Sequence, residues 1–239
     1  MTDTTYALIT GANKGLGRTA ARRLATLGWT VLIGSRDAAR GAEAVATLVA
    51  DGLAAELVVL DVTSDGSVRA AAEEVERRHG RLDVLVNNAG IVGPRVEVSE
   101  TGPDELRACY ETNVLGPVRV TRAFLPLLRK AANARVVMVS SGLGSLAVSS
   151  DPARVESRIH SLTYPSSKSA LNMITSQYAK ALPEFRVNAV DPGYTATDLN
   201  GHSGPQTVEQ GTDAIVELAT IGPDGPTGGF FDRTGRVAW

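Results

Sequence analysis

This sequence is poor in the residues that form disulfides and metal sites. It has one cysteine, Cys109, and three histidines, His79, His160 and His202, in 239 residues. A single cysteine forms no internal disulfide, which fits a reducing compartment, and we expect a cytoplasmic protein. Scattered histidines beside one cysteine provide no cluster of metal ligands, so no metal site is expected. Cys109 lies in a helical pattern and is expected to be a small buried residue.

Long apolar runs and an excess of one charge are also missing. The net charge is −2, which gives no strong field to attract nucleic acid or an anionic membrane. No apolar run approaches the ~18 residues that cross a bilayer. Met1–Tyr6 lacks the basic and apolar regions of a secretory signal. We therefore expect a small-molecule ligand, and neither nucleic acid nor a membrane as a partner.

Lysine is rare as well, since 4 of the 24 basic residues are Lys14, Lys130, Lys168 and Lys180. Lys168 stands four residues after Tyr164, so on a helix both side chains leave the same face. A nearby ammonium favours the phenolate and lowers the pKa of a tyrosine. A tyrosine tuned in this way exchanges a proton with an alkoxide or alcohol near neutral pH. The spacing alone also fits an ordinary surface pair.

Short apolar segments alternate with helical patterns along the chain. Strands are expected at 6–10, 30–34, 56–60, 83–86, 135–139 and 186–190, with a short seventh at 229–232; helices are expected at 16–27, 37–49, 64–79, 103–130 and 166–182, the fourth bent at Gly116–Pro117. Continuous apolar strands separated by helices indicate a parallel sheet covered on both faces. The expected fold is a single α/β domain over residues 1–239, with a doubly wound sheet of about seven strands.

A glycine-rich turn follows the first expected strand and opens the first helix. Its glycines are Gly11, Gly15 and Gly17. Such glycines let the backbone approach a pyrophosphate that rests on the helix N-terminus. The spacing differs from the usual dinucleotide fingerprint and from a P-loop, so a purely structural turn is the alternative.

The end of the second strand indicates which dinucleotide binds. Ser35 stands where an acidic residue would bind the ribose hydroxyl of NAD, and Arg36 follows it. An arginine suits a 2′-phosphate through charge-assisted hydrogen bonds, and Lys14 and Arg40 are placed to add to the same site. We therefore expect NADP(H) to be preferred over NAD(H). Two alternatives stay open: the arginines are solvent charges, or Asp37 reaches the ribose hydroxyl.

With these residues in view, the chain resembles a short-chain dehydrogenase/reductase over nearly its full length, and is most similar to the NADPH-dependent carbonyl reductases. The motifs occur in order: Thr10–Gly17, Leu-Asp-Val-Thr around Asp61, Asn87–Gly90, Asn113, Ser140–Ser141, Tyr164 with Lys168, and Pro192–Thr197. The resemblance implies a Rossmann fold and a catalytic set of Asn113, Ser141, Tyr164 and Lys168, with Ser140 as the rival to Ser141. It implies cofactor contacts at Gly11, Asn13, Lys14, Gly15, Leu16, Gly17, Ser35, Arg36, Arg40, Asp61, Val62, Asn88, Ala89, Gly90, Asn113, Tyr164, Lys168, Pro192, Gly193, Thr195 and Thr197.

The reaction implied by this resemblance is reversible hydride transfer between NADPH and a ketone or aldehyde. Tyr164 gives a proton to the carbonyl oxygen, and Ser141 donates a hydrogen bond to the same oxygen. Lys168 lowers the pKa of the tyrosine and holds the nicotinamide ribose. Asn113 fixes a water that connects the lysine to solvent.

Two other functions stay open. A reductase of ketoacyl groups on a carrier protein would favour a basic patch at the mouth, where Arg154 and Arg158 stand with Glu156 between them. A non-catalytic NADP-binding regulator would be expected to lose Tyr164 or Lys168, and this chain keeps both.

The resemblance departs from the shorter family members in one place. Ser141 precedes Tyr164 by 23 residues, a longer interval, so an insertion is expected at about 148–161. It borders the substrate mouth, covers the helix face through which family members usually dimerise, or is a surface excursion. A homodimer or homotetramer is expected, with a monomer left open. The candidates for the substrate pocket are apolar and indicate an apolar carbonyl compound: Ile91, Val92, Leu143, Leu146, Tyr194 and Leu199.

Overall fold

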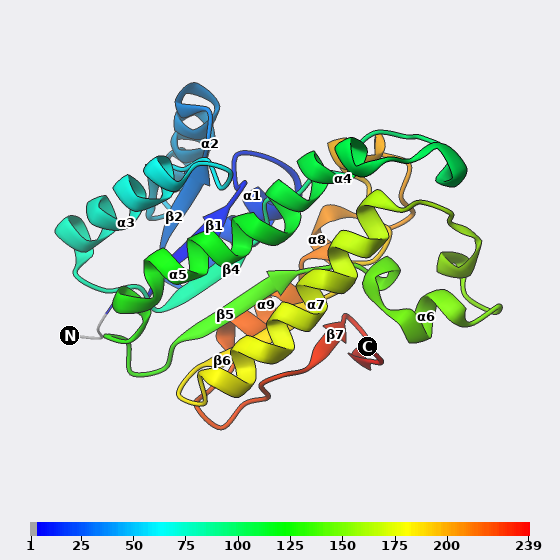
Figure 1. The fold of residues 1–239 in the computed structure, drawn as a ribbon. Helices are drawn as coiled ribbons and strands as arrows, with labels where there is room; N and C mark the ends of the chain where they lie inside the picture. The colour runs from blue at the N-terminus through cyan, green and yellow to red at the C-terminus, as the bar shows by residue number, and fades with distance from the viewer. Residues whose placement is uncertain (1–3) are drawn as a thin grey trace.

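The computed structural model describes residues 4–239; the expected absence of a secretory signal rests in part on residues 1–3, which lie outside the described residues. A sheet of eight strands forms the centre of the molecule (Figure 1), in the order β3-β2-β1-β4-β5-β6-β7-β8. The strands are β1 (Tyr6–Thr10), β2 (Thr30–Ser35), β3 (Ala55–Val59), β4 (Val84–Asn87), β5 (Arg135–Val139), β6 (Arg186–Val190), β7 (Phe230–Asp232) and β8 (Gly235–Val237). Every neighbouring pair is parallel except β7 and β8, which are antiparallel. The predicted doubly wound α/β fold is confirmed.

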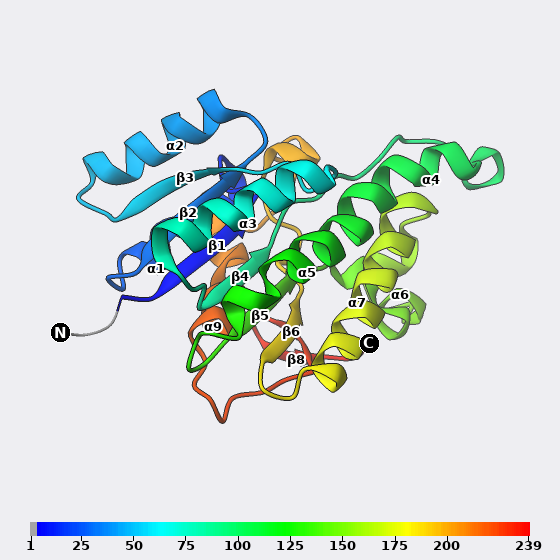
Figure 2. The same cartoon turned by 60° about the vertical axis from the view of Figure 1, so that its left-hand side comes forward.

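Helices cover both faces of the sheet, and this explains why the strands are apolar throughout. One core contains Leu8 and Leu32 with Phe124, and the opposite core contains Ile9 and Ile33 with residues of α1. The first face is covered by α3 (Asp65–His79), α5 (Gly116–Leu128) and α7 (Thr163–Ala181), and the second by α1 (Gly15–Ala25), α2 (Ala38–Ala50) and α9 (Asp213–Thr220). Figures 1 and 2 show these two helix layers on either side of the sheet.

Two helix starts follow directly from the local sequence. The Asp37 carboxylate accepts a hydrogen bond from the Arg40 backbone N–H at the start of α2. The Ser64 hydroxyl does the same for the Ser67 N–H at the start of α3. Side-chain acceptors of this kind satisfy backbone donors that the first helical turn leaves unpaired.

The expected long helix at 103–130 is divided by a π-helical turn. It consists of α4 (Pro103–Tyr110), the π-turn η2 (Glu111–Leu115) and α5, so the irregular turn ends directly before Gly116–Pro117, where the bend was expected. The irregularity lies around Asn113, whose buried amide bonds to the backbone of Ile91. A π-turn accommodates an extra residue within a helix and so changes the direction of its side chains. Such turns are frequent at functional sites.

Three other elements differ from the sequence-based expectation. Helix α7 begins at Thr163 and not at 166, so Tyr164 and Lys168 both lie within it. Strand β8 has no apolar run and was not predicted; it pairs with β7 through the register Asp232 to Gly235. The short helices α6 (Leu146–Ser150) and α8 (Val208–Gly211), and α9, were not predicted either.

The topology places a crevice at one edge of the sheet. The chain order reverses between β1 and β4, which are neighbours in the sheet. In open α/β sheets, ligands bind at the carboxyl ends of the strands at such a point. Within residues 4–239, no helix is long and apolar enough to cross a membrane.

Candidate active site

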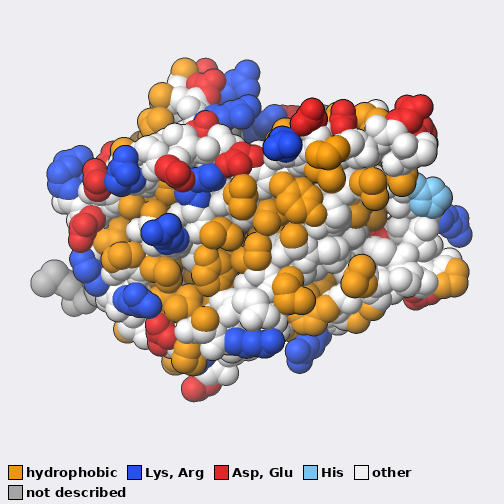
Figure 3. Space-filling view, viewed as in Figure 1, with side chains coloured by type: hydrophobic (Ala, Val, Ile, Leu, Met, Phe, Trp, Pro, Cys, Tyr) orange, Lys and Arg blue, Asp and Glu red, His pale blue; other side chains and the backbone are white. Residues whose placement is uncertain are grey.

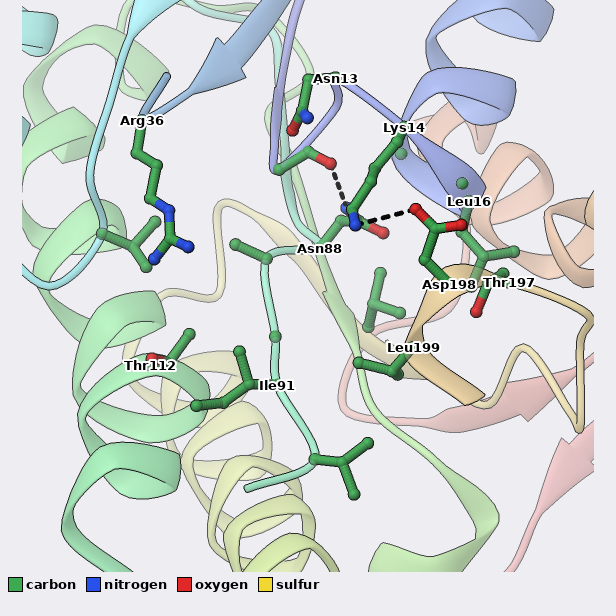
Figure 4. Close-up of a pocket in the computed structure, with 18 of the residues that line it drawn as sticks. Asn13, Lys14, Leu16, Arg36, Asn88, Ile91, Thr112, Thr197, Asp198 and Leu199 are labelled. Atoms are coloured by element: carbon green, nitrogen blue, oxygen red, sulfur yellow. Dashed lines mark hydrogen bonds and ion pairs between the residues drawn. The ribbon is translucent and has the colours of Figure 1, made fainter. Parts of the chain in front are cut away.

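A cleft of about 460 Å³ lies at the carboxyl ends of the strands (Figure 4). It brings together most of the residues that the sequence predicted for the cofactor. Those lining it are Gly11, Asn13, Lys14, Gly15, Leu16, Gly17, Arg36, Asp61, Val62, Asn88, Ala89, Gly90, Tyr164, Lys168, Pro192 and Thr197. The predicted contacts Ser35, Arg40, Asn113, Gly193 and Thr195 are not among the lining residues.

The glycine turn is shaped for close backbone approach. Gly11 and Gly15 have φ values of 65° and 53°, in the left-handed region that favours glycine. A Cβ at Gly17 would lie 2.5 Å from Asn88 Nδ2 and 2.8 Å from the Gly11 carbonyl oxygen. The backbone therefore forms a cradle that a larger side chain would fill, which fits the pyrophosphate of a dinucleotide.

Asn88 holds this turn against the end of β4. Its Nδ2 donates to the carbonyl oxygens of Thr10 at 2.7 Å and Gly11 at 3.3 Å. The Thr10 hydroxyl in turn accepts from the backbone N–H groups of Asn88 and Ala89, both at 2.9 Å. These bonds join residues far apart in sequence, so the two edges of the cleft have a fixed separation.

The segment after β3 forms the next part of the wall. The Asp61 carboxylate accepts from the Thr63 backbone N–H at 2.9 Å and from its hydroxyl at 2.7 Å. The Thr63 N–H lowers the pKa of Asp61, and the positive charges of Arg36 and Arg119 lower it further. Arg119 Nη1 also donates to the Val62 carbonyl oxygen at 2.6 Å. A carboxylate that is ionised and firmly oriented suits the predicted contact with adenine.

The three cations expected at the ribose phosphate have different positions. Arg36 lines the cleft. Lys14 lines it too, but its ammonium lies 2.9 Å from Asp198 Oδ2. Arg40 Nε lies 3.5 Å from Asp37 Oδ2. The Asp37 carboxylate is therefore engaged with the start of α2 and with Arg40, and Asp37 is not among the residues that line the cleft.

Ser35 is a buried strand residue rather than part of the cleft wall. Its side chain is 1% exposed, and its hydroxyl donates to the Asp37 carbonyl oxygen at 2.8 Å. Thr195 is similarly buried, with its hydroxyl 2.9 Å from the Pro192 carbonyl oxygen. Both residues shape the loops beside the cleft.

Tyr164 and Lys168 lie one turn apart on α7 and face the same cleft. The Lys168 ammonium is 5.5 Å from the centre of the Tyr164 ring and donates to the Val139 carbonyl oxygen at 2.7 Å. A hydrogen bond also joins Tyr164 to Ser141. The sequence-predicted pair and its serine partner therefore meet at the end of β5.

The expected lowering of the tyrosine pKa was wrong for the chain by itself. Burial raises the pKa of Tyr164, and the hydrogen bond from Ser141 offsets only part of this rise. Burial also lowers the pKa of Lys168 from 10.5 to about 8. The ammonium is 4% exposed and bonds to a carbonyl, and low-polarity surroundings disfavour its charge.

The two adjacent serines have separate environments. The Ser140 hydroxyl is buried and donates to Asn172 Oδ1 at 2.6 Å. The Ser141 oxygen accepts from the Leu143 N–H at 3.3 Å and pairs with Tyr164. Although Ser140 contributes to the lining of the cleft, this arrangement favours Ser141 as the partner of a bound carbonyl.

Asn113 is fully buried in the π-turn behind Tyr164 and Lys168. Its Nδ2 donates to the Ile91 carbonyl oxygen at 2.8 Å and to Ser167 Oγ at 3.0 Å, and its Oδ1 accepts from the Ile91 N–H at 2.9 Å. A Cβ at Gly90 would lie 3.3 Å from Asn113 Oδ1 and 3.6 Å from Lys168 Nζ. The amide and the ammonium thus face the same small space beside Gly90.

The end of the cleft at Tyr164 has apolar walls. Ile91, Val92 and Leu199 line it together with Tyr164. Other predicted pocket residues are more open: Tyr194 is 54% and Leu146 is 74% exposed. An apolar wall beside a hydrogen-bonded tyrosine suits a carbonyl compound with an apolar body.

The insertion packs back onto the end of β5. It contains α6 and the 3₁₀ turn η4 (Val155–Arg158). Glu156 lies opposite Asp191, because a Cβ at Gly142 would be 3.0 Å from Glu156 Oε1 and 2.8 Å from Asp191 Oδ2. Burial raises the pKa of Asp191.

Sequence reasoning missed several residues of the cleft, namely Leu60, Thr63, Thr112, Val139 and Asp198. All five adjoin predicted positions or end a predicted strand, so the neighbouring motifs could have identified them. Only the ion pair of Asp198 with Lys14 had no local signal, because the two residues are far apart in sequence. Within residues 4–239, no group of three or more His, Cys, Asp or Glu side chains could hold a metal ion.

Comparisons with known proteins agree with this geometry. The family described as short chain dehydrogenase matches residues 5–207. The chain is 33% identical to (-)-isopiperitenone reductase of Mentha piperita over 306 residues, covering 98% of each protein. It is 35% identical to (+)-neomenthol dehydrogenase of Arabidopsis thaliana over 283 residues, covering 95% of this chain and 96% of the relative.

Solved structures share the same fold. The NADPH-bound carbonyl reductase from chicken fatty liver has a TM-score of 0.87 and 28% identity, covering 99% of both chains. Salutaridine reductase from Papaver somniferum has a TM-score of 0.80 and 29% identity, covering 95% of this chain and 99% of that one. This chain belongs to the short-chain dehydrogenase family.

Proposed function

We propose that this protein is an NADP(H)-dependent oxidoreductase that reduces a ketone or aldehyde to an alcohol, in a reversible reaction. One observation carries the proposal: a single cleft has the glycine cradle and Arg36 at one end and Tyr164 with Lys168 at the other. A dinucleotide long enough to span these ends would place its reactive ring beside the tyrosine. The relatives named as reductases and dehydrogenases support the same class of reaction.

The cofactor would be held by groups with distinct tasks. Gly11, Gly15 and Gly17 give the pyrophosphate access to the N-terminus of α1. Asp61 and Val62 face the adenine. Arg36 is the guanidinium available to a 2′-phosphate, because no ion pair joins it to another residue within 4–239. The nicotinamide supplies the hydride when bound.

Tyr164 acts as the proton donor in the direction of reduction. Because burial keeps its pKa high, the phenol stays protonated and can donate to the carbonyl oxygen. Ser141, hydrogen-bonded to the tyrosine, donates to the same oxygen and stabilises the negative charge that develops there. Proton transfer from a phenol to an alkoxide is favourable, since an alkoxide is the stronger base.

Lys168 and Asn113 support the tyrosine. The Lys168 ammonium lies close enough to stabilise a phenolate once the proton has left. Its pKa of about 8 also lets it exchange protons near neutral pH. Asn113 faces the same space beside Gly90, where a water could connect the ammonium to solvent.

The two other functions have less support. Arg154, one of the two cations suggested for a carrier protein, is paired with Glu156 at 3.2 Å. A regulator without catalysis has no use for the hydrogen-bonded Ser141 and Tyr164 or for the buried Lys168. Carbonyl reduction accounts for all of these groups.

The proposal includes the surroundings of the site. Residues 1–239 would act as one domain in the cytoplasm. The insertion at 148–161 would border the substrate end of the cleft, because the Glu156 side chain is 16% exposed and folds back beside Gly142.

Helix α6 lies on the side of α7 away from α5 (Figure 1). It therefore leaves open the face over α5 and α7, where hydrophobic side chains gather (Figure 3). Two or four copies would associate through that face, which light scattering tests.

The experiment that tests the proposal is Tyr164→Phe. NADPH consumption is measured against a panel of ketones and aldehydes for the wild type and the variant. Loss of the proton donor should lower kcat by about 10²- to 10⁴-fold, with little change in the dissociation constant of NADPH. Tyr178→Phe, further along the same helix and packed against the core, is the matched control. Full turnover in Tyr164→Phe would show that another group donates the proton.

A further inference from the structure

Lys14 is held by a carboxylate from the opposite side of the cleft. Its ammonium lies 2.9 Å from Asp198 Oδ2, and both side chains are about half exposed, at 56% and 50%. Lys14 directly precedes α1, and Asp198 begins the 3₁₀ turn η5 (Asp198–Asn200). Figure 4 shows the pair on one side of Asn13 and Arg36 on the other. The two cations that could serve a ribose phosphate therefore point to different places.

Asp198 is presented by a turn that is stabilised by its own hydrogen bonds. The His202 N–H donates to the Thr197 carbonyl oxygen at 2.9 Å, and Asn200 Nδ2 donates to the Thr195 carbonyl oxygen at 2.8 Å. His202 Nε2 also lies 2.8 Å from Asp198 Oδ1. The hydrogen bond and charge of Lys14 lower the pKa of Asp198, so the carboxylate is ionised at neutral pH. None of these bonds within the turn involves Lys14, so the turn does not depend on the ion pair for its shape.

We infer that Asp198 competes with the cofactor's 2′-phosphate for Lys14 and is thereby a specificity-determining residue that limits the preference for NADP(H) over NAD(H). The inference rests on the proposed function, since it concerns the same cofactor. An ammonium in contact with the carboxylate must leave it to reach a phosphate on the Arg36 side. NAD(H) has no 2′-phosphate and leaves the pair intact, so the competition weakens NADP(H) alone.

The size of the effect follows from the exposure of the pair. Ion pairs between exposed side chains are weak because water and salt screen them. Releasing Lys14 from Asp198 should therefore strengthen NADPH binding by about two- to fivefold and not by orders of magnitude. The effect should shrink as the salt concentration rises, whereas the contribution of Arg36 should persist in part.

The test is the affinity of four ligands for purified Asp198→Asn, measured by calorimetry at low salt. The ligands are NADPH, NADH, 2′,5′-ADP and 5′-AMP. We expect NADPH and 2′,5′-ADP to bind about two- to fivefold more tightly than to the wild type, with NADH and 5′-AMP unchanged. The fragments lack nicotinamide, so they report on phosphate recognition without turnover. Asp198→Ser is a second variant in case the new amide itself holds Lys14.

Two controls make the result specific. Asp104→Asn removes the same charge from another exposed pair, with Arg107 on α4, and should leave all four affinities unchanged. In the Lys14→Ala background, Asp198→Asn should have no further effect on NADPH, because the competition needs the lysine. Thermal melting confirms that each variant is folded.

Three outcomes would overturn the inference: unchanged or weaker NADPH binding to both Asp198 variants, equal strengthening of NADH, or a gain that persists without Lys14. These differ from failure of the proposed function. If the wild type binds NADPH no better than NADH, the cofactor assignment fails and the inference fails with it. If the wild type prefers NADPH and the Asp198 variants do not alter that preference, only the inference fails.

Discussion

The nucleotide end and the substrate end of the cleft are built in different ways. At the nucleotide end, buried polar groups join distant segments, as when the Thr10 hydroxyl accepts from the N–H groups of Asn88 and Ala89. At the substrate end the wall is apolar, and Leu199 is 46% exposed beside Val92. Hydrogen bonds are directional and apolar contacts are not. The first end therefore suits one ligand shape, and the second tolerates a range of shapes.

This contrast separates what is common to the reaction from what is particular to the substrate. A dinucleotide has the same atoms in every turnover, so a rigid cradle is useful. In the proposed reaction a carbonyl compound needs only its oxygen placed at Tyr164 and Ser141, which are fixed by α7 and by the end of β5. Changes at the nucleotide end should therefore be costly for every substrate, and changes at the substrate end should be selective.

Gly17→Ala should have the largest effect of the variants that probe this contrast. The added Cβ would lie 2.5 Å from Asn88 Nδ2 and 2.8 Å from the Gly11 carbonyl oxygen, so the cradle must open. We expect NADPH and NADH to bind about 10- to 100-fold more weakly, measured by fluorescence titration. Gly66→Ala, near the start of α3 and with no close neighbour except Ser64 Oγ at 3.9 Å, should bind both normally.

Arg36→Ala should weaken NADPH by about 10- to 50-fold, because a charge-assisted contact with the 2′-phosphate is lost. NADH should be nearly unaffected, and the same titrations measure both ligands. Arg40→Ala is the control, since Arg40 pairs with Asp37 outside the cleft lining. Equal losses for NADPH and NADH would mean that Arg36 only shapes the loop.

Leu199→Ala should have a smaller and selective effect. Removing part of an apolar wall should raise KM for bulky apolar ketones by about three- to tenfold, with kcat and NADPH affinity almost unchanged. Small polar aldehydes should show no change in steady-state kinetics. Leu27→Ala is the control, because Leu27 is 54% exposed just after α1 and away from the cleft. A uniform loss across all substrates would indicate a rigid substrate end.

Lys168→Met should have the smallest effect in this series. It should raise the free energy of unfolding, because it removes a buried charge. Between about pH 8 and 10.5 the unfolded chain holds more protons at this lysine than the folded chain, so the free energy of unfolding rises with pH there. Below about pH 8 the folded chain carries the full cost of a buried ammonium. The variant should melt about 2–6 °C higher at neutral pH.

The pH profile checks the sign of this effect. The stability advantage of Lys168→Met over the wild type should shrink as pH rises from 8 toward 10. Melting is compared below pH 10, the usual pKa of Tyr164, so that the tyrosine does not titrate in the unfolded chain. A constant difference across this range would mean that the lysine is not buried as a charged group.

The sequence predicted what depends on local patterns. All seven expected strands are present within about a residue of their predicted ends, because continuous apolar segments must enter a covered sheet. Tyr164, Lys168 and the glycine cradle are likewise motifs of short range, and the structure brings them to one cleft.

The features that the sequence did not predict depend on contacts between residues far apart in the chain. The π-turn forms where Asn113 bonds to Ile91, which lies 22 positions away. The raised pKa of Tyr164 comes from burial beneath surrounding elements, whereas the sequence argument relied on the neighbouring lysine. Lys14 was expected at a phosphate, but its partner in the chain itself is Asp198. No local pattern encodes these pairings.

The single cysteine makes local opening of the protein interior measurable by thiol labelling. Cys109 Sγ lies 3.2 Å from Asn113 Nδ2 in the buried centre, and burial raises the pKa of the thiol. A thiol reagent can react there only when the surrounding segment opens. Since the chain has no other thiol, the labelling rate reports only on openings of the buried interior around Asn113. Because Cys109 is the single cysteine, it forms no internal disulfide, and its labelling rate gives the frequency of local opening around it.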